Sequence, residues 1–280
     1  MIALDRFVNL HCHSEYSMLD GMSRISEIVE YGKKNSGIAC ITDHRTCAGW
    51  SFLDTECKRQ EVKPIFGVEV NITGNVEVKE DKGHHLCLYA MNKKGIENIC
   101  KLVTISNSKG FYYVPRIDYD YLEAWNEGII VSSACLASDV SNLIKQELNP
   151  EGLIDWYANL FKDRYFIEFQ NHGFYEEGWV MDEIKHWADR KGLPVIATVD
   201  SHYTNKDDED IHRVLLAMNY KKSFKDVEGF TGNGYHLLSD VELLDKFSSS
   251  HLTNTMELAN KVEEGLLDFE IDKSPKFHLK

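Results

Sequence analysis

The chain has 280 residues, with 31 lysines and arginines against 45 aspartates and glutamates, so its formal net charge is −14. A hydrophobic fraction of 43% and a charged fraction of 27% are ordinary for a globular protein and exclude disordered, collagen-like and membrane-embedded classes. No apolar run in the sequence approaches the roughly 20 residues that a membrane-spanning helix needs. The acidity argues against a protein that coats nucleic acid by bulk charge, although bound metal ions could supply local positive charge.

Cysteine usage indicates a reducing compartment. The sequence has seven cysteines, an odd number, and its first residues run directly into a strand-like segment instead of a secretory signal. We therefore expect reduced thiols, not a disulfide framework, and a cytoplasmic location. Twelve histidines are the feature of the composition that most needs an explanation.

Short apolar runs alternate with helical patterns along the chain. Strands are predicted over residues 7–13, 38–44, 64–72, 85–91, 128–133, 164–171 and 194–199. Helices are predicted over residues 23–35, 95–106, 175–191 and 207–219, and a turn at 73–75 is expected to join two antiparallel arms inserted after the third strand. Seven strand–helix steps in about 205 residues favour a closed barrel of βα units, with an open doubly wound sheet as the alternative.

The pattern changes from Lys221 onward. The segment Phe230-Thr-Gly-Asn-Gly comes before two predicted helices, at residues 239–247 and 252–264. We therefore expect two parts, a barrel over residues 1–220 and a C-terminal helical appendage over residues 221–280.

Residue types that bind metal recur at or near the ends of the predicted strands. In chain order they are His11 and His13, Asp43 and His44, Glu69, His84 and His85, Cys135, Asn171 and His172, and Asp200 and His202. Side chains from several strands converge at the carboxyl end of a βα barrel, and residues two apart on a strand point the same way. The pairs at 11/13 and 200/202 can therefore each bind metal together. Imidazole, thiolate and carboxylate groups in combination suit Zn²⁺, Mn²⁺ or Fe²⁺ better than Mg²⁺ or Ca²⁺.

Several of these stretches resemble the PHP domain, named for polymerase and histidinol phosphatase. They are F-V-N-L-H-C-H-S-E-Y-S-M-L-D-G at 7–21, I-T-D-H at 41–44, K-P-I-F-G-V-E at 63–69, H-L at 85–86, S-S-A-C-L at 132–136 and A-T-V-D-S-H-Y at 197–203. The chain is most similar to the family branch at the amino terminus of bacterial DNA polymerase III α subunits, through G-F-Y-Y-V-P-R-I-D at 110–118, R-Y-F-I-E-F-Q-N-H-G at 164–173 and N-T-M-E-L-A at 254–259. The resemblance covers nearly the whole chain in the same order.

The resemblance implies an α/β fold: a distorted, TIM-like (β/α)7 barrel of the PHP type, here with a C-terminal helical appendage. It also implies a cluster of two or three divalent ions, Zn²⁺, Mn²⁺ or Fe²⁺, at the barrel mouth. The residues that would bind these ions are His11, His13, Asp20, His44, Glu69, His85, Cys135, Asp200 and His202. The chain ends at Lys280, after P-K-F-H-L, where the resemblance would place the start of a polymerase palm domain, so it is either a fragment or a free-standing polypeptide without a polymerase active site.

Three further residues are candidates for a catalytic role. Asp43 would orient a ligand imidazole, or would only cap the end of a strand. His172 would donate a proton or contact phosphate, or would only pack within a loop. Arg116, with Tyr112 and Tyr113, would offer charge and stacking faces to a nucleic-acid strand, or this loop would only latch onto the barrel.

Clustered divalent ions activate water and stabilise the entering and leaving oxygens of a phosphate ester. We therefore predict a metal-dependent phosphoesterase that hydrolyses DNA phosphodiesters, a 3′→5′ proofreading-type exonuclease in DNA replication. Its partners would be a DNA 3′ end, in a primer–template or a single strand, and a replicative polymerase chain or another replisome subunit, but no membrane.

Other functions stay open at this stage. One alternative is a non-catalytic, metal-stabilised scaffold module of a replicative polymerase. Another is a phosphomonoesterase acting on a small molecule such as histidinol phosphate, and a third is activity on nucleotides or pyrophosphate. All of these would use the same ligand residues, so the ligand set alone does not separate them.

Overall fold

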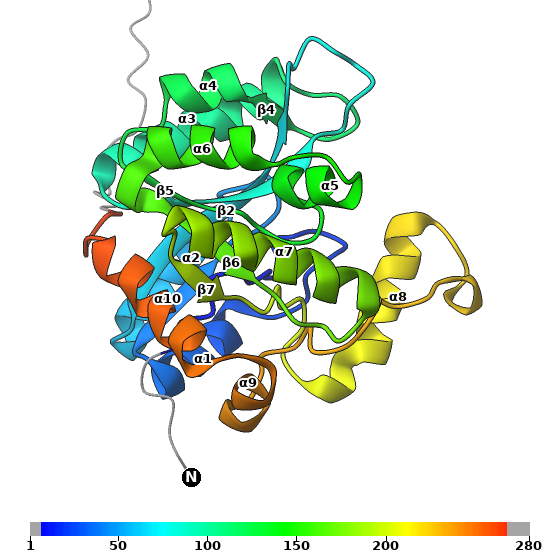
Figure 1. Cartoon of the computed structure of the whole chain (residues 1–280). Coiled ribbons are helices and arrows are strands. Elements are labelled where there is room, and N and C mark those ends of the chain that lie inside the picture. The colour runs from blue at the N-terminus through cyan, green and yellow to red at the C-terminus, as the bar shows by residue number, and fades with distance from the viewer. Residues whose placement is uncertain (1–6, 268–280) are drawn as a thin grey trace, which may run out of the picture.

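The computed structural model describes residues 7–267, which form one curled sheet wrapped on its outside by helices (Figure 1). Within this range the strands are β1 (Ile38–Ile41), β2 (Lys63–Thr73), β3 (His84–Ala90), β4 (Arg116–Asp118), β5 (Ile129–Ser132), β6 (Tyr165–Phe169) and β7 (Val195–Ala197). The helices are α1 (Ile25–Asn35), α2 (Trp50–Gln60), α3 (Lys93–Ser108), α4 (Tyr119–Ala124), α5 (Asp139–Lys145), α6 (Glu151–Phe161), α7 (Tyr175–Lys191), α8 (Glu209–Tyr220), α9 (Asp240–Lys246) and α10 (Ser249–Lys261). Residues 268–280 of the predicted appendage lie outside the described residues.

The sheet closes into a distorted barrel. Its strands pair in the order β1-β2-β3-β5-β6-β7, with β4 beside β2, and β3 runs antiparallel to both of its neighbours. The extended segment before α1 joins the two edges of the sheet. The amide of Thr42, just after β1, donates to the carbonyl oxygen of Cys12 (2.8 Å), and the amide of Ser201, after β7, donates to the carbonyl oxygen of His11 (3.2 Å). The predicted fold class is therefore confirmed.

The first predicted strand and the predicted antiparallel arms differ from the structure in detail. Residues 7–13 are extended, but they meet their neighbours only through isolated bridges, such as that between Cys12 and Ser201. The two antiparallel arms are β2 and β3 themselves, and the expected turn at 73–75 is part of a longer loop at 74–83. The reversal is completed at Gly83, where φ is +78° and an added Cβ would lie 2.8 Å from the carbonyl oxygen of Ile72. Only glycine fits this position without strain.

Several elements fall where no helix or strand was predicted: β4 and the helices α2, α4, α5 and α6. α4 and α5 are only six and seven residues long. Such helices carry too little periodicity to be found from sequence, and here each begins at a side-chain cap, Asp118 and Ser138 respectively. The later predicted helices agree with α7, α8, α9 and α10 to within a few residues.

The segment after residue 220 packs against the barrel through α9 and α10. Leu238, Leu243 and Leu252 form a buried cluster with Phe7 and Val199, separate from the main core of the barrel. By contrast, α8 and the loop after it project from one side of the molecule (Figure 1). A boundary at residues 220/221 stays a prediction. None of the helices within residues 7–267 combines the length and apolar character needed to cross a bilayer.

Candidate metal centre

The nine predicted ligands meet at one end of the barrel. They come from the extended first segment and its following loop, from the residues after β1, β5 and β7, and from β2 and β3. The residues are His11, His13, Asp20, His44, Glu69, His85, Cys135, Asp200 and His202. Cys12, between the two first histidines, points the other way into the hydrophobic core, as alternation along an extended segment requires.

Glu69 stands at the centre of the cluster and is 1% exposed. Its Oε1 lies 2.7 Å from Nδ1 of His85, and its Oε2 lies 2.8 Å from Nδ1 of His44. Nε2 of His13 is 3.3 Å from Oε2, and Nε2 of His11 is 3.5 Å from Oε1. One carboxylate therefore faces four imidazoles from three different parts of the chain.

Two aspartates complete the ring of charge. Oδ1 of Asp200 lies 3.2 Å from Nε2 of both His11 and His13. Oδ2 of Asp20 lies 2.8 Å from Nε2 of His44. Asp200 has a left-handed backbone, with φ at +51°, which is unfavourable for a residue with a Cβ and is typical of functional sites.

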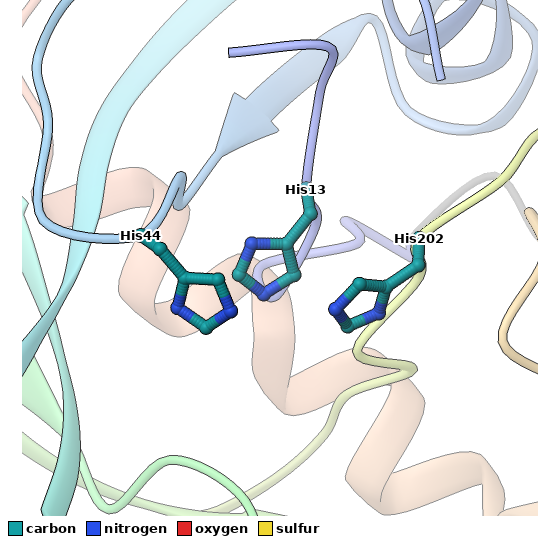
Figure 2. Close-up of side chains that lie close together, drawn as sticks. All are labelled: His13, His44 and His202. Carbon is teal, nitrogen blue, oxygen red and sulfur yellow. The ribbon is translucent and has the colours of Figure 1, made fainter. Parts of the chain in front are cut away.

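The imidazoles of His13, His44 and His202 face a common space (Figure 2). The ring of His13 lies between the other two, with its centroid 4.3 Å from each. The three offer nitrogen atoms within 4.8 Å of one another. On the rim, Sγ of Cys135 lies 3.5 Å from Nδ1 of His85.

Four buried atoms of the cluster have no hydrogen-bond partner among the described residues: Nε2 of His13, Nδ1 of His44, Oε2 of Glu69 and Oδ1 of Asp200. They lie 2.8–3.3 Å from one another in ion pairs, without hydrogen bonds. A buried polar atom left unpaired costs about 1–3 kcal/mol. Four such atoms around one space, all of ligand type, fit a site for divalent cations.

Opposite charges stabilise one another in the cluster. Burial opposes ionisation of Glu69, but His85 and the other imidazoles hold the pKa of this carboxyl well below its usual range. Burial likewise opposes the charge on His44, yet Glu69 and Asp20 raise the pKa of this imidazole to about 9. A cation that binds here must displace these protons, so metal binding is expected to release protons.

Glu168 on β6 orients His11. Its Oε2 lies 2.8 Å from Nδ1 of His11 and accepts the hydroxyl of Thr198 at 2.6 Å, while its Oε1 accepts the hydroxyl of Ser132 and the amide of Ala134. Because an ionised carboxylate only accepts, Nδ1 of His11 carries the proton and Nε2 is free to face the cluster. The sequence analysis missed Glu168, although a charged residue inside a buried strand was a usable signal.

Asp43 orients the imidazole of His13, not that of its sequence neighbour His44. Its carboxylate accepts the amide of Ser14 (2.7 Å) and the hydroxyl of Ser17 (2.8 Å). Oγ of Ser17 in turn lies 2.9 Å from Nδ1 of His13 and accepts the amide of His44 at 3.1 Å. Asp43 therefore orients His13 through Ser17, and it reaches the ring of His44 through no hydrogen bond within residues 7–267.

Cys87 is a further residue that the sequence analysis did not place at the site. The antiparallel register sets it directly opposite Glu69, with His85 two residues away on the same strand face. Its Sγ lies 3.6 Å from Nδ1 of His11. Burial raises the pKa of the Cys87 thiol, so it stays neutral beside the cluster. The register between β2 and β3, which sequence does not show, was needed to find it.

His172 lies at the wall of the site, but both of its ring nitrogens already contact other groups of the protein. Nδ1 is 2.5 Å from Oε1 of Glu177, and Nε2 is 2.8 Å from the carbonyl oxygen of Val199. The ring stacks on Tyr235, with centroids 3.9 Å apart. A role as proton donor therefore requires one of these contacts to break during the reaction.

Arg116 is not part of the site. Its fully buried guanidinium donates to the backbone carbonyls of Gly110 (3.0 Å), Val78 (2.8 Å) and Val76 (2.7 Å), and to that of Asp81. These bonds fix the 74–83 loop and the start of the 109–115 loop. The expected contact between Arg116 and a nucleic-acid strand does not fit this structure, because no face of the guanidinium is open.

Two cavities of about 380 and 450 Å³ open on either side of the cluster, and Asp20, His44 and His85 line both. A larger cavity of about 690 Å³ lies between α1 and α9 and contains none of the predicted ligands. Chemistry, not size, therefore identifies the site. The smaller of the two flanking cavities has aromatic walls, formed by Phe174, Phe230 and Tyr235.

Comparison with known proteins identifies the family of the chain. The PHP domain family model matches residues 9–172. The DNA polymerase III subunit alpha of Borreliella burgdorferi is 32% identical over 94% of this chain and 24% of its own length. The subunits of Deinococcus radiodurans and Aquifex aeolicus are 33% and 31% identical, over 80% and 94% of this chain and 18% and 25% of their own lengths. The chain thus spans a quarter or less of these relatives.

Among solved structures, an amidohydrolase from Chromobacterium violaceum superposes on 70% of this chain and 87% of its own, with a TM-score of 0.48 and 14% identity. This likeness is too distant to bear on function. The family model, in contrast, covers more than half of the chain and includes seven of the nine converging side chains. The chain belongs to the PHP domain family and is related to bacterial DNA polymerase III α subunits.

Proposed function

We propose that this chain is a metal-dependent phosphoesterase that hydrolyses DNA phosphodiesters, as a 3′→5′ proofreading-type exonuclease of DNA replication. The observation that carries the proposal is the convergence of nine ligand-type side chains on one space, with four buried donor atoms left without hydrogen bonds. Two or three ions, Zn²⁺, Mn²⁺ or Fe²⁺, would be held by His11, His13, Asp20, His44, Glu69, His85, Cys135, Asp200 and His202.

When bound, such ions polarise a phosphate ester and make water more acidic, so no serine or cysteine nucleophile is required. The protein's own contribution is to hold the ligands in fixed orientations. Glu168 keeps the proton of His11 on Nδ1, and Ser17 accepts from Nδ1 of His13 while donating to Asp43. Both Nε2 atoms are thereby presented to the cluster without rearrangement.

The two flanking cavities favour a phosphodiester over a small phosphomonoester. A phosphodiester carries a substituent on each side of the phosphorus, and here a cavity lies on each side of the shared residues Asp20, His44 and His85. In one of them the rings of Phe230 and Tyr235 pack edge to face, with their centroids 4.9 Å apart. These rings offer surfaces on which a base could stack.

The charge of the chain supports a protein partner that presents the DNA. At −14, the chain is too acidic to hold a DNA strand tightly by bulk charge. Its relatives are named as subunits of a DNA polymerase. We therefore propose that a replicative polymerase chain or another replisome subunit, in the cytoplasm, delivers the 3′ end.

One observation favours a second candidate, a metal-stabilised scaffold without catalysis. His11 and His13 are fully buried and Glu69 is 1% exposed, so the cluster is open to solvent mainly at its rim, at Asp20, His44, His85 and Asp200. Ions held mainly by the buried members would stabilise the fold and contribute little to a reaction.

Digestion of a 3′-mismatched primer–template separates the two candidates. Wild-type protein of measured metal content would be compared with the Asp200→Asn variant and with Asp189→Asn as a control. Asp189 suits the control because it is an exposed carboxylate on α7, paired with Lys185. Stepwise 3′ shortening that Asp200→Asn loses and Asp189→Asn keeps is the expected result. No shortening by protein that holds two or three ions would refute the exonuclease and leave the scaffold.

A further inference from the structure

One cation stands beside the cluster. Arg45 directly follows the ligand His44, and among the described residues it is the only lysine or arginine that lines either flanking cavity. The cavity that contains Arg45 measures about 450 Å³ and is otherwise lined by neutral groups, such as Tyr16 and Asn107, and by the cluster itself. The cavity on the other side contains the carboxylates of Glu176 and Glu177.

Two contacts hold Arg45 at the edge of the cluster. Its amide donates to the carbonyl oxygen of Glu69 at 2.7 Å, and its Nη1 donates to Oδ1 of Asn71 at 3.0 Å. A guanidinium has five N–H donors, and the bond to Asn71 is the one hydrogen bond that its side chain makes within residues 7–267. The remaining donors are therefore available to a ligand in the cavity.

The backbone of Arg45 is left-handed, with φ at +59°. This conformation costs about 1–2 kcal/mol for a residue with a Cβ, whereas glycine adopts it freely. Arg45 is not the cap of a helix, where such a conformation is common. Strain that persists at the edge of a site, at a residue whose side chain faces a cavity, points to a function for that side chain.

We propose that Arg45 binds a phosphate of the polynucleotide substrate, next to the phosphate that lies at the cluster. The planar guanidinium matches phosphate with two parallel hydrogen bonds. With the cation on one side of the cluster, and aromatic rings and carboxylates on the other, the sugar–phosphate backbone extends toward Arg45 while a base occupies the aromatic cavity. The substrate is then a strand that spans both cavities. This inference rests on the proposed function.

Binding of a phosphorothioate-linked, fluorescein-labelled single-stranded oligodeoxynucleotide to the metal-loaded full chain tests the inference without turnover. Arg45→Gly removes the cation and relieves the strain, so this variant should unfold no more easily than wild type while its Kd rises about tenfold or more. Arg45→Lys keeps the positive charge but not the planar guanidinium, so its Kd should lie between those of wild type and Arg45→Gly.

Lys162→Gly is the matched control. Lys162 is an exposed cation with φ at +54°, between α6 and β6 and away from both cavities. Its removal changes the net charge by the same amount and also places glycine at a position of positive φ, and the Kd should stay within twofold of wild type. Equal Kd values for Arg45→Gly and Lys162→Gly would overturn the inference, as would an absence of oligonucleotide binding by wild type.

The outcomes separate this inference from the proposed function. Arg45-dependent binding by a protein that does not shorten a primer would support the phosphate contact and refute the exonuclease. Hydrolysis with the same KM and Kd in both glycine variants would support the exonuclease and refute the role of Arg45.

Discussion

Glu168→Gln offers a direct test of how the cluster is oriented. Glu168 is fully buried and accepts hydrogen bonds on both oxygens: His11 and Thr198 donate to Oε2, and Ser132 and the amide of Ala134 donate to Oε1. Glutamine has nearly the same shape, but it has one accepting oxygen and one NH₂ group that only donates.

Either orientation of the new amide has a cost. With its NH₂ toward Ala134, the Ala134 amide loses its acceptor, which costs about 1–3 kcal/mol of stability. With its NH₂ toward His11, the imidazole must move its proton to Nε2, the atom that faces the cluster. We therefore expect a loss of about 1–3 kcal/mol in the free energy of unfolding, together with metal binding that is roughly 10–100 times weaker.

The assay is metal affinity, by competition with a chelator, measured beside urea denaturation. Glu177→Gln is a matched control: Glu177 is also buried and also faces an imidazole, that of His172, but His172 is not among the proposed ligands. Both variants should lose stability, and only Glu168→Gln should lose metal affinity. Wild-type affinity in Glu168→Gln, or an equal loss in both variants, would refute the reasoning that Glu168 acts through His11.

Three other predictions concern pH and packing. The metal-free protein should lose stability as pH rises from 6.5 to 9, because the raised pKa of His44, about 9, adds stability that is complete below 6.5 and lost above 9. The metal-loaded protein should instead gain stability over this range. Thermal unfolding of both forms checks this prediction. Arg116→Met should cost about 3 kcal/mol or more, because it leaves several buried carbonyls unpaired, without changing metal content, as urea denaturation and metal analysis would show. Gly110→Ala should lower the urea midpoint sharply, since its Cβ would lie 1.9 Å from the carbonyl oxygen of Arg116. Gly178→Ala on α7, whose Cβ meets nothing within 4 Å, should instead raise the free energy of unfolding by up to about 1 kcal/mol.

The types and positions of the ligand residues could be predicted from sequence because they depend on short-range geometry. His11 and His13 share a side since they lie two apart on an extended segment, and Cys12 faces the core for the same reason. Convergence at one end of the barrel followed from the alternation of strands and helices and from the family resemblance. The roles of these residues as ligands stay a prediction, although the structure brings all of them together.

Contacts between distant segments were decided only by the tertiary structure. Cys87 faces Glu69 because β3 is antiparallel to β2 in one particular register. Glu168 meets His11 because closure of the barrel brings their side chains together, although β6 itself pairs with β5 and β7. Arg116 follows aromatic residues in sequence, yet the fold buries it under backbone carbonyls. The sequence by itself determined which side chains share a face of each segment, because that depends on local alternation. The partners of these side chains were determined by strand register, strand direction and burial, because those depend on how the whole barrel closes.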